Sequence, residues 1–285
     1  MAASDFWADH FSTILILISA LFHAGWSAAV KSTSDKFSIT FMMCAGGGIL
    51  CLPLTFFVPF PTSELWFWLI ISLILHGGYQ AVLLKTLEAG DLTHVYPIAR
   101  GTGPLFVAFI SFFLLAEKLT LPEYLAIAII VGGIFLTGSF RFTPETRKAT
   151  ILALFTGIFI AGYSVIDAIG VKTANNPFSF IIWSNVIFAP VFIAAGLKSR
   201  GIRIFQDTLA NWHIGVPVMI IAYTGYALAL LAYRHGSIAE VAALRETSII
   251  FATLIGLIIL KESFSKRRTL AAIIIAFGAI ILKIN

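Results

Sequence analysis

Charged residues are scarce in this sequence. Only 12% of its 285 residues are Asp, Glu, Lys or Arg, whereas these types make up about a quarter of an ordinary soluble domain. Apolar residues account for 59% of the chain, and the mean hydropathy is +0.96. A water-soluble globule of this size needs a polar shell that so few charged side chains cannot build. The composition therefore excludes a soluble protein and predicts a polytopic membrane protein.

The sequence also lacks the motifs that bind nucleotides and metals. It contains no Gly-x-x-x-x-Gly-Lys-Ser/Thr stretch for the phosphates of ATP, and no His-Glu-x-x-His or Cys/His cluster. Cys44 and Cys51 lie in one apolar segment, where a helix would hold them roughly 10 Å apart, too far for a disulfide. The net charge of +5 falls in short loops, so it does not indicate a nucleic-acid surface. We expect no cofactor, no metal, no nucleic-acid partner and no enzymatic activity.

Ten segments have the length and apolarity of membrane-spanning helices. A helix of about twenty apolar residues crosses the hydrocarbon core of a bilayer. No long hydrophilic stretch separates these segments, so we expect an all-α protein with ten transmembrane helices and no soluble domain. The predicted spans are residues 12–30, 39–58, 65–84, 93–115, 121–139, 150–170, 178–197, 213–232, 238–260 and 268–284.

Lysine and arginine are divided unevenly between alternate loops. The side shared with both termini carries only Lys118, Lys172, Arg234 and Lys283. Basic loops face the cytoplasm by the positive-inside rule, so we expect a multi-pass protein of the bacterial inner membrane with both termini outside. The opposite side carries Lys31, Lys36, Lys85, Arg141, Arg147, Lys148, Lys198, Arg200, Arg203, Lys261, Lys266, Arg267 and Arg268.

The two halves of the sequence resemble each other, which predicts two five-helix repeats, residues 1–145 and 146–285. Because five is an odd number, the second repeat would enter the membrane inverted, an architecture typical of transporters that work by alternating access. Chance similarity between apolar helices is the alternative. The paired stretches are Phe22–Ser27 with Phe159–Ser164, Gly78–Tyr79 with Gly225–Tyr226, Arg100–Thr102 with Arg245–Thr247, and Glu117 with Glu262.

Arg100 and Arg245 lie well inside predicted spans. Each is seven or eight residues from the end of its segment, which corresponds to a depth of ~11 Å. A charge at the bilayer centre costs at least ~2.5–3.5 kcal/mol, so neither side chain is expected to face lipid. The pair can bind a substrate carboxylate or phosphate, for which the guanidinium fork is suited. Alternatively, Glu246 and other polar groups neutralise both arginines in a fixed internal network.

Two prolines flank Arg100, at positions 97 and 104. Each removes one backbone donor, which leaves the carbonyls near positions 93 and 100 without helical partners. We therefore expect the span 93–115 to be broken or kinked where it lines a cavity beside Arg100. An ordinary proline kink used for packing is the alternative. The span 238–260 contains no proline, so any substrate site would be asymmetric.

Polar aromatic side chains gather on some of the spans. His23, Trp26 and Ser27 share one helical face, and Tyr79, Tyr96, Tyr163, Trp183 and Tyr226 lie within other spans. Packing explains each of them singly, whereas the whole set indicates a cavity, because buried Tyr and Trp need polar partners. Segments 121–139 and 268–284 are almost wholly aliphatic and small, which places them at the periphery or at a helix–helix contact.

Four titratable residues within spans are candidates for proton coupling: Glu246, His23, His76 and Asp167. Burial favours the neutral form of a carboxyl group, so an unpaired Glu246 could titrate near neutrality. As the alternative, Asp167 lies close to the end of its segment and is simply solvated, and the histidines are packed core residues. Glu117 and Glu262 close their helices beside loops, where we expect capping or loop pairing.

These features resemble the EamA family of the drug/metabolite transporter superfamily. The resemblance rests on the ten spans, the five-plus-five duplication, the Glu117 and Glu262 endings, and a Pro-Leu-Phe-Val-Ala run that begins at Pro104. It implies a basket of helices around a central cavity lined by Trp26, Tyr163, Tyr79 and Arg100. It also implies transport of small metabolites, often outward and without ATP. Three features depart from the family: Ile249 or Ile250 replaces a common proline, the paired arginines are not general, and many relatives keep both termini in the cytoplasm.

The sequence therefore predicts a secondary transporter for a small anionic or zwitterionic metabolite, amino-acid-like or an organic acid. Its partners would be that substrate and the lipid bilayer, and the protein would be a monomer or homodimer. A broad-specificity drug exporter is the alternative within transport. An intramembrane enzyme or a scaffold without transport activity is the alternative from another class. The candidate substrate-binding residues are His23, Trp26, Tyr79, Tyr96, Arg100, Tyr163, Trp183, Tyr226, Arg245 and Glu246.

Overall fold

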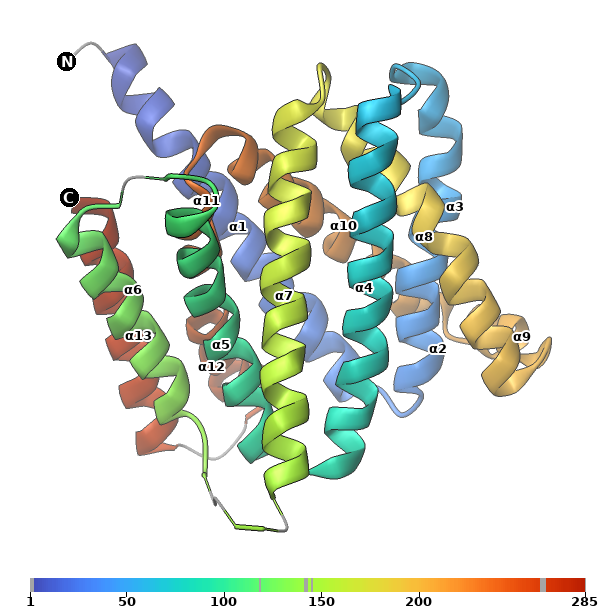
Figure 1. Cartoon of the computed structure of the whole chain (residues 1–285). Helices are drawn as coiled ribbons and strands as arrows, with labels where there is room; N and C mark the ends of the chain where they lie inside the picture. The colour runs from blue at the N-terminus through green and yellow to red at the C-terminus, as the bar shows by residue number, and fades with distance from the viewer. Residues whose placement is uncertain (1–2, 118, 141–142, 145, 262–264, 285) are drawn as a thin grey trace.

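Helices form nearly all of the chain in the computed structural model, which describes residues 3–117, 119–140, 143–144, 146–261 and 265–284 (Figure 1). No strand occurs in these ranges. The helices are α1 Ala3–Ser32, α2 Lys36–Phe41, the π-helix η1 Met42–Gly46, α3 Gly47–Cys51, the 3₁₀ helix η2 Leu52–Phe57, α4 Ser63–Ala89, α5 Leu92–Phe113, α6 Leu121–Leu136, α7 Arg147–Thr173, α8 Pro177–Arg200, α9 Arg203–Ala210, α10 Trp212–His235, α11 Ile238–Arg245, α12 Ser248–Ile258 and α13 Lys266–Ile284.

Eight stretches of the described chain are long and apolar enough to cross a membrane. The all-helical, polytopic membrane architecture predicted from the sequence is therefore confirmed. Two of the ten predicted spans do not meet this criterion: α6 has only 16 residues, and α13 begins with three basic residues. The eight stretches are His10–Ser32, Lys36–Phe57, Ser63–Ala89, Thr93–Phe113, Arg147–Thr173, Pro177–Arg200, Trp212–His235 and Ile238–Ile258.

The long helices run up and down between two faces of the molecule (Figure 1). We call one the terminal face, where α1 begins, α13 ends, and α7 connects to α8 and α10 to α11. We call the other the basic face, where α1 connects to α2, α4 to α5, and α12 to α13. The basic face carries Lys31, Arg200 and Arg268 from the strongly basic set of loops.

Small residues bring the long helices close together. A Cβ atom on Gly225 of α10 would lie 3.1 Å from Phe22 of α1, and one on Gly78 of α4 would lie 2.4 Å from Phe159 of α7. Ser19 Oγ also donates a hydrogen bond of 2.6 Å to the carbonyl of Gly225. Close backbone approach of this kind is typical of helix packing within membranes. These contacts place α1 along α10 and α4 along α7.

Helices α6 and α13 pair with each other at one edge of the molecule (Figure 1). A Cβ on Gly133 would lie 2.7 Å from Ile275, and a Cβ on Gly278 would lie 2.8 Å from Ile130. The prediction that segments 121–139 and 268–284 form a peripheral helix–helix contact is confirmed.

Of the predicted break or kink around Arg100, the break is absent, because α5 runs without interruption from Leu92 to Phe113 with both prolines inside it. One carbonyl freed by proline has found another donor. The Ser139 N–H donates a hydrogen bond of 2.9 Å to the carbonyl of Thr93, the residue whose helical partner Pro97 removes. The satisfied carbonyl removes one reason for the helix to open.

The break lies instead in the other half, in the span predicted as residues 238–260. Here α11 ends at Arg245 and α12 begins at Ser248. The N–H groups of Glu246 and Thr247 donate to the carbonyls three residues earlier, at 3.1 and 3.0 Å, which is 3₁₀ rather than α geometry. The Thr247 hydroxyl also donates to the carbonyl of Leu244 at 2.7 Å. The interruption places Glu246 inside the protein without any proline.

The predicted span 39–58 is also irregular, because a π-helical turn separates α2 from α3. The ring of Tyr223 lies so close to Gly47 that a Cβ there would overlap it, at 1.8 Å. The Tyr223 hydroxyl donates a hydrogen bond of 3.0 Å to the carbonyl of Cys44, within the π-helix. A π-helical turn leaves backbone groups open to such side-chain partners.

Candidate functional site

Arg100 forms a buried ion pair with Glu246. Its Nη2 atom lies 2.9 Å from Oε2 of Glu246, and the two side chains are 10% and 1% exposed. The same nitrogen donates a hydrogen bond of 3.1 Å to the hydroxyl of Ser248. The pair connects α5 to the break between α11 and α12. Arg100 therefore has the internal partner that its depth in the membrane required.

Arg245 ends α11 and has much weaker partners. Its Nη2 donates a long hydrogen bond of 3.4 Å to the hydroxyl of Ser164. Its guanidinium carbon lies 5.9 Å from the centroid of the Tyr163 ring, within range of a cation–π interaction. It forms no ion pair within the described part of the chain. Arg245 is therefore a buried cation stabilised mainly by neutral groups.

Both guanidinium groups keep an unused donor. The Nε atoms of Arg100 and Arg245 are buried and have no hydrogen-bond partner among the described residues. Leaving a buried donor unpaired costs about 1–3 kcal/mol, and more for a charged group. Glu246 lies within electrostatic range of both arginines. Two cations thus share one carboxylate, an arrangement that favours an additional anion.

A second polar group, which we call the Asp167 cluster, lies where α4, α7 and α10 meet. The Asp167 carboxylate accepts hydrogen bonds from the hydroxyls of Ser72, at 2.5 Å, and Tyr226, at 3.0 Å. Nε2 of His76 lies 3.0 Å from the same carboxylate. Asp167 is only 2% exposed. The expectation that it is solvated near a helix end is wrong, because α7 extends to Thr173.

Aromatic rings connect the Asp167 cluster to the arginines. The His76 ring stacks on Tyr163 with a centroid distance of 4.2 Å, and Tyr79 meets the same ring edge-on at 5.4 Å. His23 packs edge-on against Trp26 at 4.9 Å. His23 and Tyr79 are each within electrostatic range of both guanidinium groups. We call this whole assembly around Arg100, Arg245 and Glu246 the arginine site.

Tyr96 lies at a cavity of about 330 Å³ on the basic face. It is 44% exposed and precedes Arg100 by about one helical turn on α5. Neither arginine of the arginine site lines this cavity. Lys31 and Arg268 lie on its wall. The other lining residues include Ser27, Thr93, Thr137, Thr253, Gly256, Leu257, Ser265 and Thr269.

Trp183 is not brought to the arginine site. Its ring packs against Phe60 at 5.2 Å and Trp66 at 5.8 Å, near the terminal face. The side chain of Asn185, on the same helix, donates a hydrogen bond of 2.6 Å to the carbonyl of Ile181, so its amide is bound to the backbone of α8. The aromatic character of this segment therefore contributes to packing.

Hydrogen bonds on the terminal face connect Glu117 to the start of α11. The Glu117 carboxylate accepts from the N–H of Ile238 at 2.9 Å, from the Ser237 hydroxyl at 3.3 Å and from the N–H of Ala239 at 3.4 Å. A carboxylate is stabilised at a helix N-terminus by the free N–H groups and the helix dipole. The predicted capping role of Glu117 is confirmed. Glu262 lies outside the described residues.

Arginine and lysine add further links on the terminal face. Nη1 of Arg234 donates to the carbonyls of Val171 at 2.9 Å and Ala174 at 3.1 Å, and also contacts that of Lys172. Lys172 in turn donates to the carbonyl of Gly236 at 2.9 Å. The Arg234 bonds satisfy carbonyls at the end of α7, and the Lys172 bond satisfies one at the end of α10, where helical partners are lacking. They tie α7 to the junction of α10 and α11.

Comparison with known proteins identifies the family. The sequence model of the EamA-like transporter family matches residues 10–139 and again residues 147–284. The chain belongs to the EamA-like transporter family. An uncharacterized transporter of Methanothermobacter thermautotrophicus is 23% identical over 214 residues, which cover 72% of this chain and 61% of that protein. A solved crystal structure superposes with a TM-score of 0.72 over 97% of both chains at 17% identity, which shows a shared fold.

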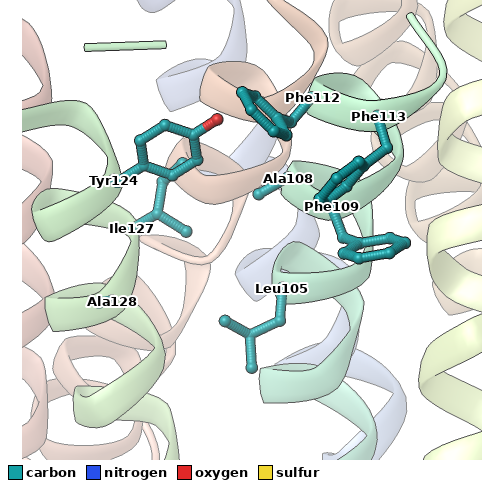
Figure 2. A pocket seen from close by; sticks show the side chains of 8 residues that line it. All are labelled: Leu105, Ala108, Phe109, Phe112, Phe113, Tyr124, Ile127 and Ala128. Atoms are coloured by element: carbon teal, nitrogen blue, oxygen red, sulfur yellow. The ribbon is translucent and has the colours of Figure 1, made fainter. Parts of the chain in front are cut away.

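This EamA-like protein has a second cavity, of about 340 Å³, between α5 and α6 (Figure 2). Its lining is apolar apart from the hydroxyl of Tyr124, and Phe109 and Phe113 are 56% and 63% exposed. An apolar groove on the outside of a membrane protein suits lipid chains rather than a polar metabolite. The residues that line it are Leu105, Ala108, Phe109, Phe112, Phe113, Tyr124, Ile127 and Ala128.

Three serines of the site were missed in the sequence. Ser72, Ser164 and Ser248 supply hydroxyls to Asp167, Arg245 and Arg100. Ser72 stands four residues before His76, a spacing that puts both on one helical face. That pattern is the signal that would have pointed to the Asp167 cluster in this family member.

Proposed function

We propose that this EamA-like protein is a secondary active transporter for a small organic metabolite that carries a carboxylate or phosphate-like group. The observation that carries the proposal is the pair of buried guanidinium groups that share a single carboxylate, Glu246. Each retains an unpaired Nε donor. A bound anion would supply the missing acceptor and the missing negative charge.

Arg245 is the primary anion ligand in this proposal. Arg100 already has an ion-pair partner, so its main effect is to hold Glu246 at the break between α11 and α12. Arg245 forms no ion pair among the described residues, and its contacts include the Ser164 hydroxyl and the Tyr163 ring. An anion on Arg245 can lie against the aromatic wall of Tyr79, Tyr163 and Trp26. That wall would accept an organic portion such as that of an amino acid or organic acid.

We also propose ten spans, built as two inverted five-helix repeats that comprise residues 1–145 and 146–285. The double match of the family model supports this arrangement. Reciprocal contacts support it as well. Phe22 and Phe159 occupy corresponding places in the two halves, as do Gly78 and Gly225. Each phenylalanine contacts the glycine of the other half: Phe22 contacts Gly225, and Phe159 contacts Gly78. Such exchange of roles is expected around a pseudo-two-fold axis in the membrane plane.

The transport route in this proposal begins at the basic face. The cavity on this face is lined by Tyr96, which precedes Arg100 by about one helical turn on α5, and in this proposal it is the entrance to the arginine site. The terminal face is held closed by the contacts of Glu117 and Arg234. With the orientation favoured by the positive-inside rule, the open side is the cytoplasm, which is the loading side of an exporter.

A binding screen with purified protein tests the proposal. Amino acids, organic acids, phosphonates and cationic dyes are compared for their effect on the melting temperature, because a ligand of the folded state raises it. We expect anions or zwitterions to stabilise the protein, and stabilisation by cationic dyes alone would point to a drug exporter.

The variant Arg245→Lys then tests the role of the arginine. It keeps the charge but loses the planar fork, so it should bind the stabilising anion about tenfold or more weakly. The matched control is Arg203→Lys on exposed α9, which should bind normally. Wild-type binding and transport by Arg245→Lys in proteoliposomes would refute the assignment.

A further inference from the structure

We propose that His76 and Asp167 form a proton-binding site that is coupled to anion binding at Arg245. This inference rests on the proposed function, since it names the ion that moves with the substrate. The evidence is the geometry of the Asp167 cluster, which is separate from the ion pair of Arg100 and Glu246.

The Asp167 carboxylate accepts hydrogen bonds from several side chains. Three donors from two other helices converge on it: Ser72 and His76 from α4, and Tyr226 from α10. These donors occupy the acceptor positions of the carboxylate. Of the three donors, only the imidazole changes its protonation state near neutral pH. A proton taken up by the pair therefore resides on His76.

His76 is the more exposed member of the pair. Its side chain is 19% exposed, whereas that of Asp167 is 3% exposed. Within the described chain its one hydrogen bond is made by Nε2, toward Asp167. A proton from water can add to the lone pair of Nδ1 and convert the hydrogen bond into an ion pair, and no other bond is broken.

The proton site and the anion site share the ring of Tyr163. His76 stacks on this ring at 4.2 Å, and the guanidinium of Arg245 lies 5.9 Å from its centroid. A protonated His76 thus brings a second cation close to Arg245. Mutual repulsion is relieved when an anion binds, so the proton and the anion should each strengthen binding of the other.

The other groups around the pair fit this interpretation. Tyr79 of α4, Tyr163 of α7, and Tyr226 and Tyr233 of α10 contribute phenol side chains around the pair. Helix α8 contributes the uncharged ring of Phe188, 4.8 Å from the imidazole. Arg245 of α11 is a charged group that contacts the same Tyr163 ring as His76. The proton balance of the cluster is therefore set by His76 and Asp167.

The pair also joins the two proposed repeats, because His76 and Ser72 belong to the first and Asp167 and Tyr226 to the second. A proton bound at this junction can therefore cross the membrane together with the anion during alternating access. A steep substrate gradient would then carry the proton in the same direction as the substrate.

Proton uptake by purified protein tests the site without any substrate. A soluble pH-indicator dye reports uptake as the medium is acidified from about pH 8 to about pH 5, the range over which histidine titrates. We expect His76→Gln to take up about one proton fewer than the wild type. Asp167→Asn serves as the second variant, because it removes the carboxylate that His76 contacts at 3.0 Å, and it should also take up less proton than the wild type over this range. Equal uptake curves for wild type and both variants would refute the proton site.

Anion binding at several pH values tests the coupling. Sulfate and L-glutamate are used as probes, because their charge stays nearly constant over this range. In the wild type the apparent Kd should fall by up to about tenfold for each unit of decreasing pH where the proton binds. In His76→Gln the anion should still bind, but with an affinity independent of pH. An unchanged pH dependence in His76→Gln would overturn the coupling. If neither probe binds the wild type, the anion proposal and the coupling fail, while the uptake experiment still decides the proton site.

Discussion

The carboxylate of Glu246 meets the guanidinium of Arg100 at 2.9 Å, although the two residues come from opposite halves of the sequence. The contact is possible because α11 ends at Arg245 and the chain turns before α12 begins. An internal carboxylate therefore lies beside a second buried arginine, and the local charge depends on this one acid.

Glu246→Gln should destabilise the protein and strengthen anion binding. The substitution leaves two buried guanidinium groups without a carboxylate, and breaking a buried pair costs about 3–5 kcal/mol. The same excess of positive charge should lower the Kd for sulfate. Denaturant unfolding in detergent and sulfate titration measure the two effects.

Removing both partners distinguishes the ion pair from simple packing. In Arg100→Met combined with Glu246→Met neither charge is left alone, and such replacements are often neutral or stabilising. We expect the double variant to recover most of the stability lost in Glu246→Gln. A double variant less stable than Glu246→Gln would show that the ion pair is not the cause.

Glu117→Ala should loosen the terminal face. The substitution removes the acceptor of the Ile238 and Ala239 N–H groups, and loss of a helix cap costs about 1 kcal/mol. Hydrogen exchange at these two amides should therefore accelerate about fivefold.

Glu123→Ala is the matched control for this prediction. Glu123 also accepts from the start of a helix, since it binds the N–H of Thr120 at 2.5 Å, but it serves its own helix α6. Its loss should leave exchange at Ile238 unchanged. Equal acceleration in both variants would mean that Glu117 has no specific role in holding α11.

Asp35 should make the basic face sensitive to acid. Arg200 binds its carboxylate through two nitrogens, at 2.8 and 3.0 Å, and these hydrogen bonds hold the pKa of Asp35 well below its usual value. Because the pKa is lower in the folded than in the unfolded protein, the stabilisation is present above about pH 4 and lost as the pH falls further. The pair lies at the surface, so its contribution is about 1 kcal/mol or less.

Asp35→Asn should therefore lose stability at neutral pH and show a flatter decline below about pH 4. Melting temperatures measured between about pH 3 and pH 7 compare the variant with the wild type. Parallel curves for the two proteins would mean that the Arg200 contact does not stabilise the fold.

Much of the fold was predictable because hydropathy and small residues act locally. The eight long apolar stretches match predicted spans, and Gly133 and Gly278 marked the contact between α6 and α13. The prolines do not break α5, because their effect depends on whether a distant donor satisfies the freed carbonyl. Ser139 does so for Thr93. At the break near Glu246, the local features are the 3₁₀ hydrogen bonds and the hydrogen bond of the Thr247 hydroxyl. No proline or glycine marks this position in the sequence.

The sequence by itself determined that this is a helical membrane protein of the EamA-like kind, with two arginines that have to find internal partners. Chain length, apolar composition and the cost of a charge in lipid are sufficient for that conclusion. Only the tertiary structure decided that Glu246 pairs with Arg100 while Arg245 rests on Tyr163, and that Asp167 is buried against His76. Partners of buried charges are set by which helices pack together, and that choice depends on contacts between residues far apart in the chain.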